Sequence, residues 1–175
     1  YGLVPETLFV AVTTIDRFLS ARNEGLRRAR DIEAIGIAAL LIASKYEDIY
    51  PPALDEMIKM MNRPSNRKEV LEWEFKILKT LVFQITVPTP LRFLERFAST
   101  SIVYQNAFQL AQYVIELALY DFDIAYNLTP SEIASVALFI AVNFDFNSNS
   151  ITGKQKWSAE IAKEASMKKG KIIEY

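Results

Sequence analysis

Ile35-Gly-Ile-Ala-Ala-Leu-Leu-Ile-Ala43 is a run of sequence without a single charged or strongly polar side chain. A helix that is apolar on every side is buried on every side, so we interpret this run as the central helix of a helical bundle. The segment extends from Asp31 to about Asp48. Pro51-Pro52 ends it, because proline interrupts the hydrogen bonding of a helix.

A second apolar run, Ile133 to Phe144, matches the first at a constant shift of 98 residues, which sets Ile133 over Ile35. An amphipathic segment precedes each run, Thr7–Ser20 and Tyr104–Tyr120 respectively. Two buried helices can also coincide because they share a small set of residue types. The equal order of the surrounding elements favours an internal repeat. We therefore expect an all-α chain of two tandem helical bundles.

Helix signals outside the two runs support this organisation. Asn66 with Glu69, and Thr129 with Glu132, have the spacing of capping boxes. Val87-Pro-Thr-Pro90 is typical of a short rigid linker, so we predict one domain over residues 1–86 and another over 87–175. Further helices are expected over residues 5–19, with Leu8, Val12, Ile15 and Leu19 on one face, and over 53–61, 66–81, 90–98, 104–120, 129–144 and 154–167.

Composition excludes several classes of function. The 175 residues are 51% hydrophobic and 23% charged, as in a packed globular protein. The chain has no Cys and no His, which removes thiol nucleophiles, Cys/His zinc sites and histidine-based triads. Asp121 with Asp123, and Glu72 with Glu74, diverge at this spacing on a helix, so we interpret them as solvated carboxylates. We expect no enzymatic activity, no metal and no cofactor.

Charge and hydropathy bear on possible partners. The net charge of −1 argues against a nucleic-acid or membrane partner, and no apolar run is long enough to span a bilayer. Two local basic patches are a loop over Ala21–Arg30 and a group of lysines near the C-terminus. We interpret both as solvated surface. The lysines are Lys154, Lys156, Lys163, Lys168, Lys169 and Lys171.

Lys45 is an anomaly, because it lies one turn after Leu41 on an otherwise apolar helix. Its stem can lie along the core while its ammonium group reaches water near the end of the helix. Glu74 has a similar setting between Val70 and Ile77. A half-buried carboxylate requires a hydrogen-bond donor. Either Lys45 and Glu74 pair with each other, or both are directed at another protein.

The chain resembles a mitotic cyclin of the A or B type. The resemblance is strongest from Glu6 to about Phe97 and weaker beyond. The residues that carry it are Glu6-Thr-Leu, Ile15-Asp-Arg-Phe-Leu19, Leu40-Leu-Ile-Ala-Ser-Lys-Tyr-Glu-Asp-Ile-Tyr-Pro-Pro52, Glu72-Trp-Glu-Phe-Lys-Ile-Leu-Lys79 and Thr86-Val-Pro-Thr-Pro-Leu-Arg-Phe-Leu94.

The resemblance implies two cyclin boxes, the first without its first helix and the second without its last. It also implies a non-catalytic subunit that binds and activates a cyclin-dependent kinase in the nucleus and cytoplasm of a eukaryotic cell. Activation would consist of binding only the active arrangement of the kinase. By matching position, the implied kinase-contacting residues are Lys45, Tyr46, Glu47, Glu74, Phe75, Leu78, Phe83 and Ile85.

Three positions qualify the resemblance. Asn143 stands in the second repeat where Lys45 stands in the first, so only the first box would carry the kinase site. Asp16 matches a structural aspartate whose arginine partner belongs to the absent first helix, so we expect Asp16 to be unpaired. Glu33 stands where a substrate-docking glutamine is common, which puts docking in doubt. Without the first helix, apolar surface should be exposed on Ile35–Ala43 and Leu8–Leu19.

Two other functions remain possible from the sequence. A cyclin-fold module of the transcription-factor type would need a basic face across both bundles, and this chain is nearly neutral. A kinase-independent adaptor would have no need of both Lys45 and Glu74.

Overall fold

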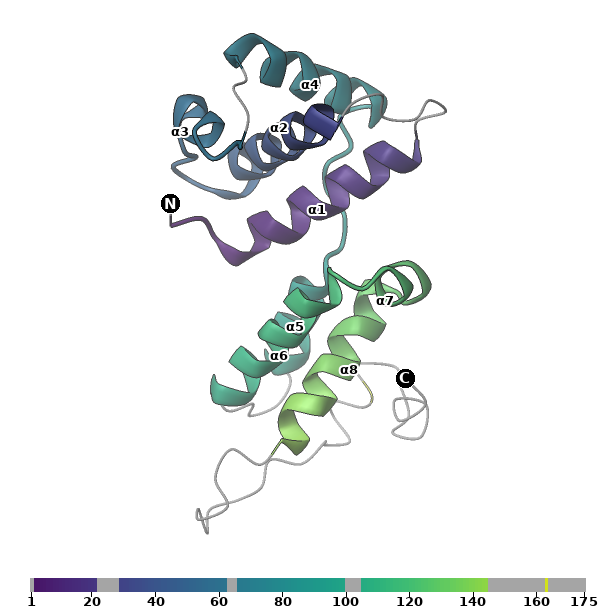
Figure 1. Cartoon of the computed structure of the whole chain (residues 1–175). Coiled ribbons are helices and arrows are strands. Elements are labelled where there is room, and N and C mark those ends of the chain that lie inside the picture. The colour runs from purple at the N-terminus through teal and green to yellow at the C-terminus, as the bar shows by residue number, and fades with distance from the viewer. Residues whose placement is uncertain (1, 22–28, 63–65, 100–104, 145–162, 164–175) are drawn as a thin grey trace. The chain divides into compact units, whose positions relative to one another are not determined.

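The computed structural model of the chain describes residues 2–21, 29–62, 66–99, 105–144 and 163 (Figure 1). Over these residues the regular structure is helical and no strand occurs, which confirms the expected all-α class. The chain divides into two compact units, Tyr1–Val87 and Pro88–Tyr175.

The apolar segment of the first unit forms its central helix. This helix, α2, lies between α1 and α4 and also contacts α3 (Figure 1). Ile35, Ala38, Ile42 and Ala43 are all buried within it, as their sequence pattern predicts. The four helices described in this unit are α1 (Pro5–Ser20), α2 (Ala29–Glu47), α3 (Leu54–Ile58) and α4 (Arg67–Thr80).

Local signals fix the ends of these helices. Pro5 occupies the first turn of α1, where the missing N–H costs nothing. The side chain of Asn66 accepts a 2.8 Å hydrogen bond from the backbone N–H of Glu69 and caps α4, as the sequence predicts. The helix predicted over residues 53–61 is shorter than expected, because regular structure ends at Ile58 and turns follow.

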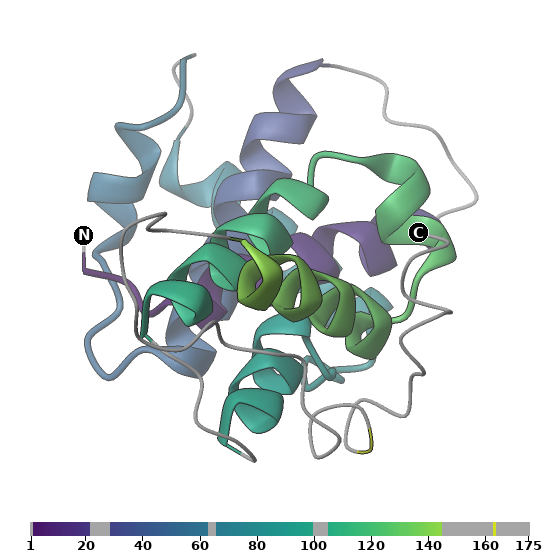
Figure 2. The same cartoon turned by 90° about the horizontal axis from the view of Figure 1, so that it is seen from below.

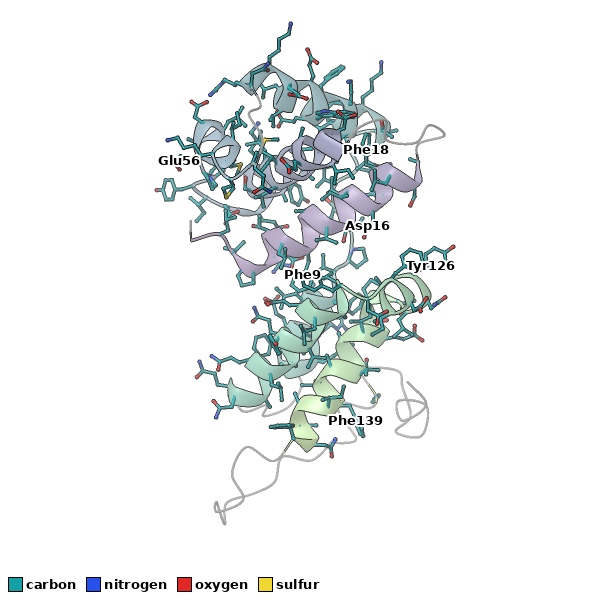
Figure 3. All side chains as sticks on the ribbon, viewed as in Figure 1. Phe9, Asp16, Phe18, Glu56, Tyr126 and Phe139 are labelled. Carbon is teal, nitrogen blue, oxygen red and sulfur yellow. The ribbon has the colours of Figure 1, made fainter. Side chains whose placement is uncertain are left out.

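The packing face of α1 differs from the expected stripe. Leu8 and Leu19 are 44% and 39% exposed, whereas Phe9, Thr14 and Phe18 face the core. Figure 3 shows Phe18 and Asp16 on different sides of this helix. The expected exposure is therefore confirmed for Leu8 and Leu19, while Phe9, Val10 and Phe18 of the same segment are buried. It is wrong for Ile35–Ala43, whose residues are buried or partly buried against α1, α3 and α4.

The second unit is built around the second apolar run. Helix α8 packs against α6 and α5, and Figure 2 shows this helix from a second direction. Ala134, Ala137, Leu138 and Ala141 are buried along it. The described helices of this unit are α5 (Pro90–Ser99), α6 (Gln105–Ala118), α7 (Phe122–Asn127) and α8 (Pro130–Asn143).

Both hydrogen bonds of the predicted capping box are present at the start of α8. Thr129 Oγ1 accepts from the backbone N–H of Glu132 at 3.4 Å, and the backbone N–H of Thr129 donates to Glu132 Oε2 at 2.9 Å. The short helix α7 was not predicted. The helix expected over residues 154–167 lies outside the described residues.

Candidate functional site

Lys45 and Glu74 form an ion pair on the surface of the first unit. Lys45 lies in the last turn of α2, and Glu74 lies in the middle of α4. Lys45 Nζ donates to Glu74 Oε1 at 2.7 Å. The two helices pack against each other, so they bring together residues that are 29 positions apart in sequence. The structure thus pairs the two anomalous charges found in the sequence.

The two partners differ in exposure. The side chain of Lys45 is 50% exposed, while that of Glu74 is only 14% exposed. Next to them, Leu41 and Ile77 belong to the core. An ammonium group has three N–H donors, and within the described part of the chain Glu74 is the only partner of Lys45. Lys45 therefore retains donors that face solvent.

Tyr46 and Glu47 follow Lys45 at the end of α2. Tyr46 is half exposed, and its hydroxyl group forms a short hydrogen bond with Thr86 Oγ1. Glu47 is partly buried. Ile49 and Tyr50, next along the chain, are almost completely exposed. These two exposed side chains were not part of the predicted site, although they follow it closely in the sequence.

An apolar strip runs from α4 into the segment that follows it. Phe75 is 61% exposed and Leu78 is partly buried. Phe83 is 67% exposed, and Ile85 is buried in the core beneath the surface. Exposed aromatic side chains such as these are enriched at interaction surfaces. We refer to Lys45, Tyr46, Glu47, Glu74, Phe75, Leu78 and Phe83 as the α2–α4 face.

Backbone strain distinguishes the end of this strip. Val82 and Phe83 have φ angles of 51° and 58°, in the left-handed region. That conformation costs a residue with a side chain roughly 1–2 kcal/mol. Both side chains are largely exposed, so the strained backbone does not place them in the core. An exposed phenylalanine held at a conformational cost is a candidate binding residue, independently of any resemblance.

Glu33 lies apart from the α2–α4 face. It precedes Lys45 by 12 positions on the same helix, a separation of about 18 Å along the axis. Its Oε1 accepts a long 3.5 Å hydrogen bond from Asn62 Nδ2. Its Oε2 is buried without a partner in the described structure. This geometry does not connect the predicted substrate-docking residue to the other site residues.

Asp16 is a surface residue of α1 with partial burial. No hydrogen bond or ion pair reaches its carboxylate from the described residues, as expected from the sequence. The partial burial raises the pKa of Asp16 above its ordinary value of 3.8.

The interpretation as solvated carboxylates is correct for Asp121, Asp123 and Glu72, which are exposed, and wrong for Glu74, whose side chain is only 14% exposed. Asp121 caps α7, because its Oδ1 accepts from the backbone N–H groups of Asp123 and Ile124 at 3.0 and 3.1 Å. Glu72 lies 4.0 Å from Lys68 on the same helix. Among the described residues, no group of three or more acidic side chains is arranged to hold a metal ion. The side chains of the two basic patches lie outside those described, apart from the exposed Lys163.

The described fold is two helical units, each built around an apolar central helix, and the α2–α4 face is the candidate site. Comparison with known families is more specific. The cyclin N-terminal domain matches residues 1–86, and the cyclin C-terminal domain matches residues 88–174. The chain therefore belongs to the cyclin family.

Curated relatives are A- and B-type cyclins. The chain is 39% identical over 147 residues to human cyclin-A1, covering 84% of this chain and 31% of that protein. It is 35% identical over 160 residues to G2/mitotic-specific cyclin-B2 of Gallus gallus, covering 91% of this chain and 37% of that protein. The chain thus spans about a third of the length of these relatives.

A solved structure supports the fold alone. The X-ray structure of a viral cyclin from herpesvirus saimiri superimposes with a TM-score of 0.76 at 20% identity, covering 94% of this chain and 70% of that chain. Within the described residues, no helix is both long and apolar enough to cross a membrane.

Proposed function

We propose that this chain is a non-catalytic subunit that binds and activates a cyclin-dependent serine/threonine kinase through the α2–α4 face, in the control of mitosis. Family membership and the A- and B-type relatives support a role in the cell cycle. The observation that carries the site is the Lys45–Glu74 pair beside an exposed aromatic strip. Action on a nuclear and cytoplasmic kinase is part of the same proposal.

The geometry suits recognition of a partner's backbone. The ammonium group of Lys45 has free N–H donors for carbonyl oxygens of a partner. Its hydrogen bond to Glu74 holds the ammonium group in place. Phe75 and Phe83 supply apolar area on the neighbouring surface. Polar groups that are desolvated on binding need complementary partners, and here the ion pair already satisfies part of that need.

Activation follows from selective binding. If the α2–α4 face fits only the active arrangement of the kinase, binding shifts the kinase population toward that arrangement. The shift cannot exceed the difference in affinity between the two kinase states. The cyclin then needs no catalytic residue of its own.

The competing function is a kinase-independent adaptor or a transcription-factor-like module with the same fold. Such a protein would use a different surface, so substitutions of Lys45 and Glu74 would leave its binding unchanged. The Lys45–Glu74 pair favours the kinase proposal, because an adaptor that uses another surface has no need of both charges.

The test begins with recovery of a kinase from cell extract by the full chain, followed by calorimetry with that kinase. Lys45→Ala and Glu74→Ala should each weaken binding by about 2–5 kcal/mol, or roughly 30- to 5,000-fold, because each leaves a charge unpaired in the interface. Activity of the recovered kinase on a peptide substrate should fall in parallel at fixed cyclin concentration.

The matched control is another ion pair in the same unit. Arg67 Nη1 lies 3.1 Å from Asp55 Oδ1, and both side chains are more than half exposed. Arg67→Ala should change kinase affinity little, since exposed pairs contribute up to about 1 kcal/mol. Kinase binding that survives both Lys45→Ala and Glu74→Ala contradicts the assigned site, and failure to recover any kinase contradicts the function.

A further inference from the structure

The second unit has an apolar groove between α6, α7 and α8. Its volume is about 570 Å³, and the described residues that line it lie between Val114 and Ile140. This surface belongs to the other unit from the α2–α4 face, and its interpretation does not depend on kinase binding. Its apolar walls come mainly from Val114 and Leu117 of α6, Ile124 of α7, and Ile133, Val136 and Ile140 of α8.

The walls of the groove are unusually accessible for aliphatic side chains. Leu117, Ile124 and Ile140 each expose more than a third of their surface. The rings of Phe122 and Tyr126, both on α7, stack with centroids 5.4 Å apart, and both are largely exposed. Figure 3 labels Tyr126 on this helix. Aromatic residues next to an apolar depression are typical of binding hot spots.

Among the described residues, the charges that line the groove are acidic. Asp121 and Asp123 are the charged residues that line it. Asp121 is fixed by its hydrogen bonds to the first turn of α7, while the carboxylate of Asp123 has no partner in the described structure. No Lys or Arg occurs between Arg96 and Lys154. Nothing along this stretch of sequence therefore neutralises the two carboxylates.

We propose that the groove between α6, α7 and α8 binds an amphipathic helix of a partner protein that carries basic residues at one end of its apolar stripe. A helix presents apolar residues at spacings of three and four, and recognition of an amphipathic helix in an apolar groove uses such a stripe. Lys or Arg at one end of that stripe would meet Asp121 and Asp123. An acidic or uncharged helix would lack this complementarity.

The probe is a fluorescently labelled synthetic peptide with Leu at every third or fourth position and two Lys at one end of the stripe. The full chain should bind this peptide saturably in an anisotropy titration. Ile140→Glu should weaken binding more than tenfold, because it places a charge on the apolar wall. Asp123→Lys should weaken binding about fivefold through charge reversal.

Matched variants in the first unit control for nonspecific effects. Ile32 is an exposed isoleucine of α2, and Asp55 is an exposed aspartate of α3. Ile32→Glu, Asp55→Lys and Lys45→Ala should each bind the peptide like the parent chain. Circular dichroism should confirm that every variant keeps its helical signal.

Several outcomes would overturn the proposal. One is that the peptide does not bind the full chain saturably. This outcome includes a peptide that binds only after residues 145–175 are removed. A second is equal binding of a peptide with Glu in place of both Lys. A third is concentration-dependent dimerisation without peptide that Ile140→Glu abolishes, which would assign the groove to a second copy of the chain.

Discussion

Asp48 joins the end of α2 to the beginning of α1 through Thr7. Its Oδ2 accepts from Thr7 Oγ1 at 2.7 Å, and its Oδ1 accepts from the backbone N–H of Val4 at 2.8 Å. Thr7 is fully buried. One carboxylate thus satisfies a buried hydroxyl group and an N–H at the start of a helix. This link ties the chain just after α2, which ends at Glu47, to the beginning of α1.

Asp48→Ala should destabilise the chain by about 1–3 kcal/mol, because it leaves the buried hydroxyl group of Thr7 without its partner. Chemical denaturation monitored by circular dichroism measures this difference. Asp55→Ala serves as the control, because Asp55 forms only an exposed ion pair and should cost less than about 1 kcal/mol. Equal losses in the two variants would contradict the role assigned to Asp48.

Glycine substitutions at Val82 and Phe83 should affect the stability of the chain and its affinity for the kinase differently. Glycine tolerates positive φ, so Val82→Gly should stabilise the chain by roughly 0.5–1 kcal/mol after the entropic cost of glycine. Phe83→Gly should relieve strain in the same way and also weaken kinase binding, because the exposed ring is lost. Thermal unfolding and calorimetry together measure both effects. A loss of stability in both variants would show that these side chains support the fold.

Asp16 predicts a dependence of stability on pH. Its folded-state pKa lies above its ordinary value of 3.8, so the folded chain is destabilised when Asp16 is ionised. This penalty is complete above the raised pKa and declines as the pH falls toward 3.8. Asp16→Asn should therefore raise the unfolding midpoint at neutral pH, and the advantage should shrink on acidification. An advantage that is constant from neutral pH to about pH 4 would contradict ionisation as its cause.

The fold was largely predictable because its main determinants are local. An all-round apolar helix and a capping box are patterns within a few turns of chain, and both were recognised correctly. Helix α7 was missed because six residues are too short for a periodic pattern, and its cap Asp121 was its main signal. The face of α1 was misassigned because its buried side includes Thr7 and Thr14, which a search for apolar residues overlooks.

The candidate site was predictable only in part. Lys45 and Glu74 were conspicuous as charges among apolar neighbours, but their pairing depends on how α2 packs against α4. No glycine or asparagine stands at the left-handed positions Val82 and Phe83, so strain there cannot be predicted from residue type. The exposure of Ile49 and Tyr50 is likewise a tertiary property.

The Lys45–Glu74 pair predicts different coupling energies in the free chain and in a kinase complex. In the free chain half of the Lys45 side chain is exposed, so a double-mutant cycle for unfolding with Lys45→Ala and Glu74→Ala should give a coupling of about 1 kcal/mol or less. In the complex the same pair is desolvated, and the coupling in binding should exceed that in folding.

Thermal melts separate the two effects, because loss of an internal bridge can mimic loss of a contact. Variants that bind more weakly while melting near the parent temperature would show that the charges act in the interface. A binding loss fully accounted for by the loss of stability would show instead that Lys45 and Glu74 only hold α2 and α4 together. The Arg67→Ala and Asp55→Ala cycle supplies the baseline, because that pair is an exposed ion pair of the same unit outside the α2–α4 face.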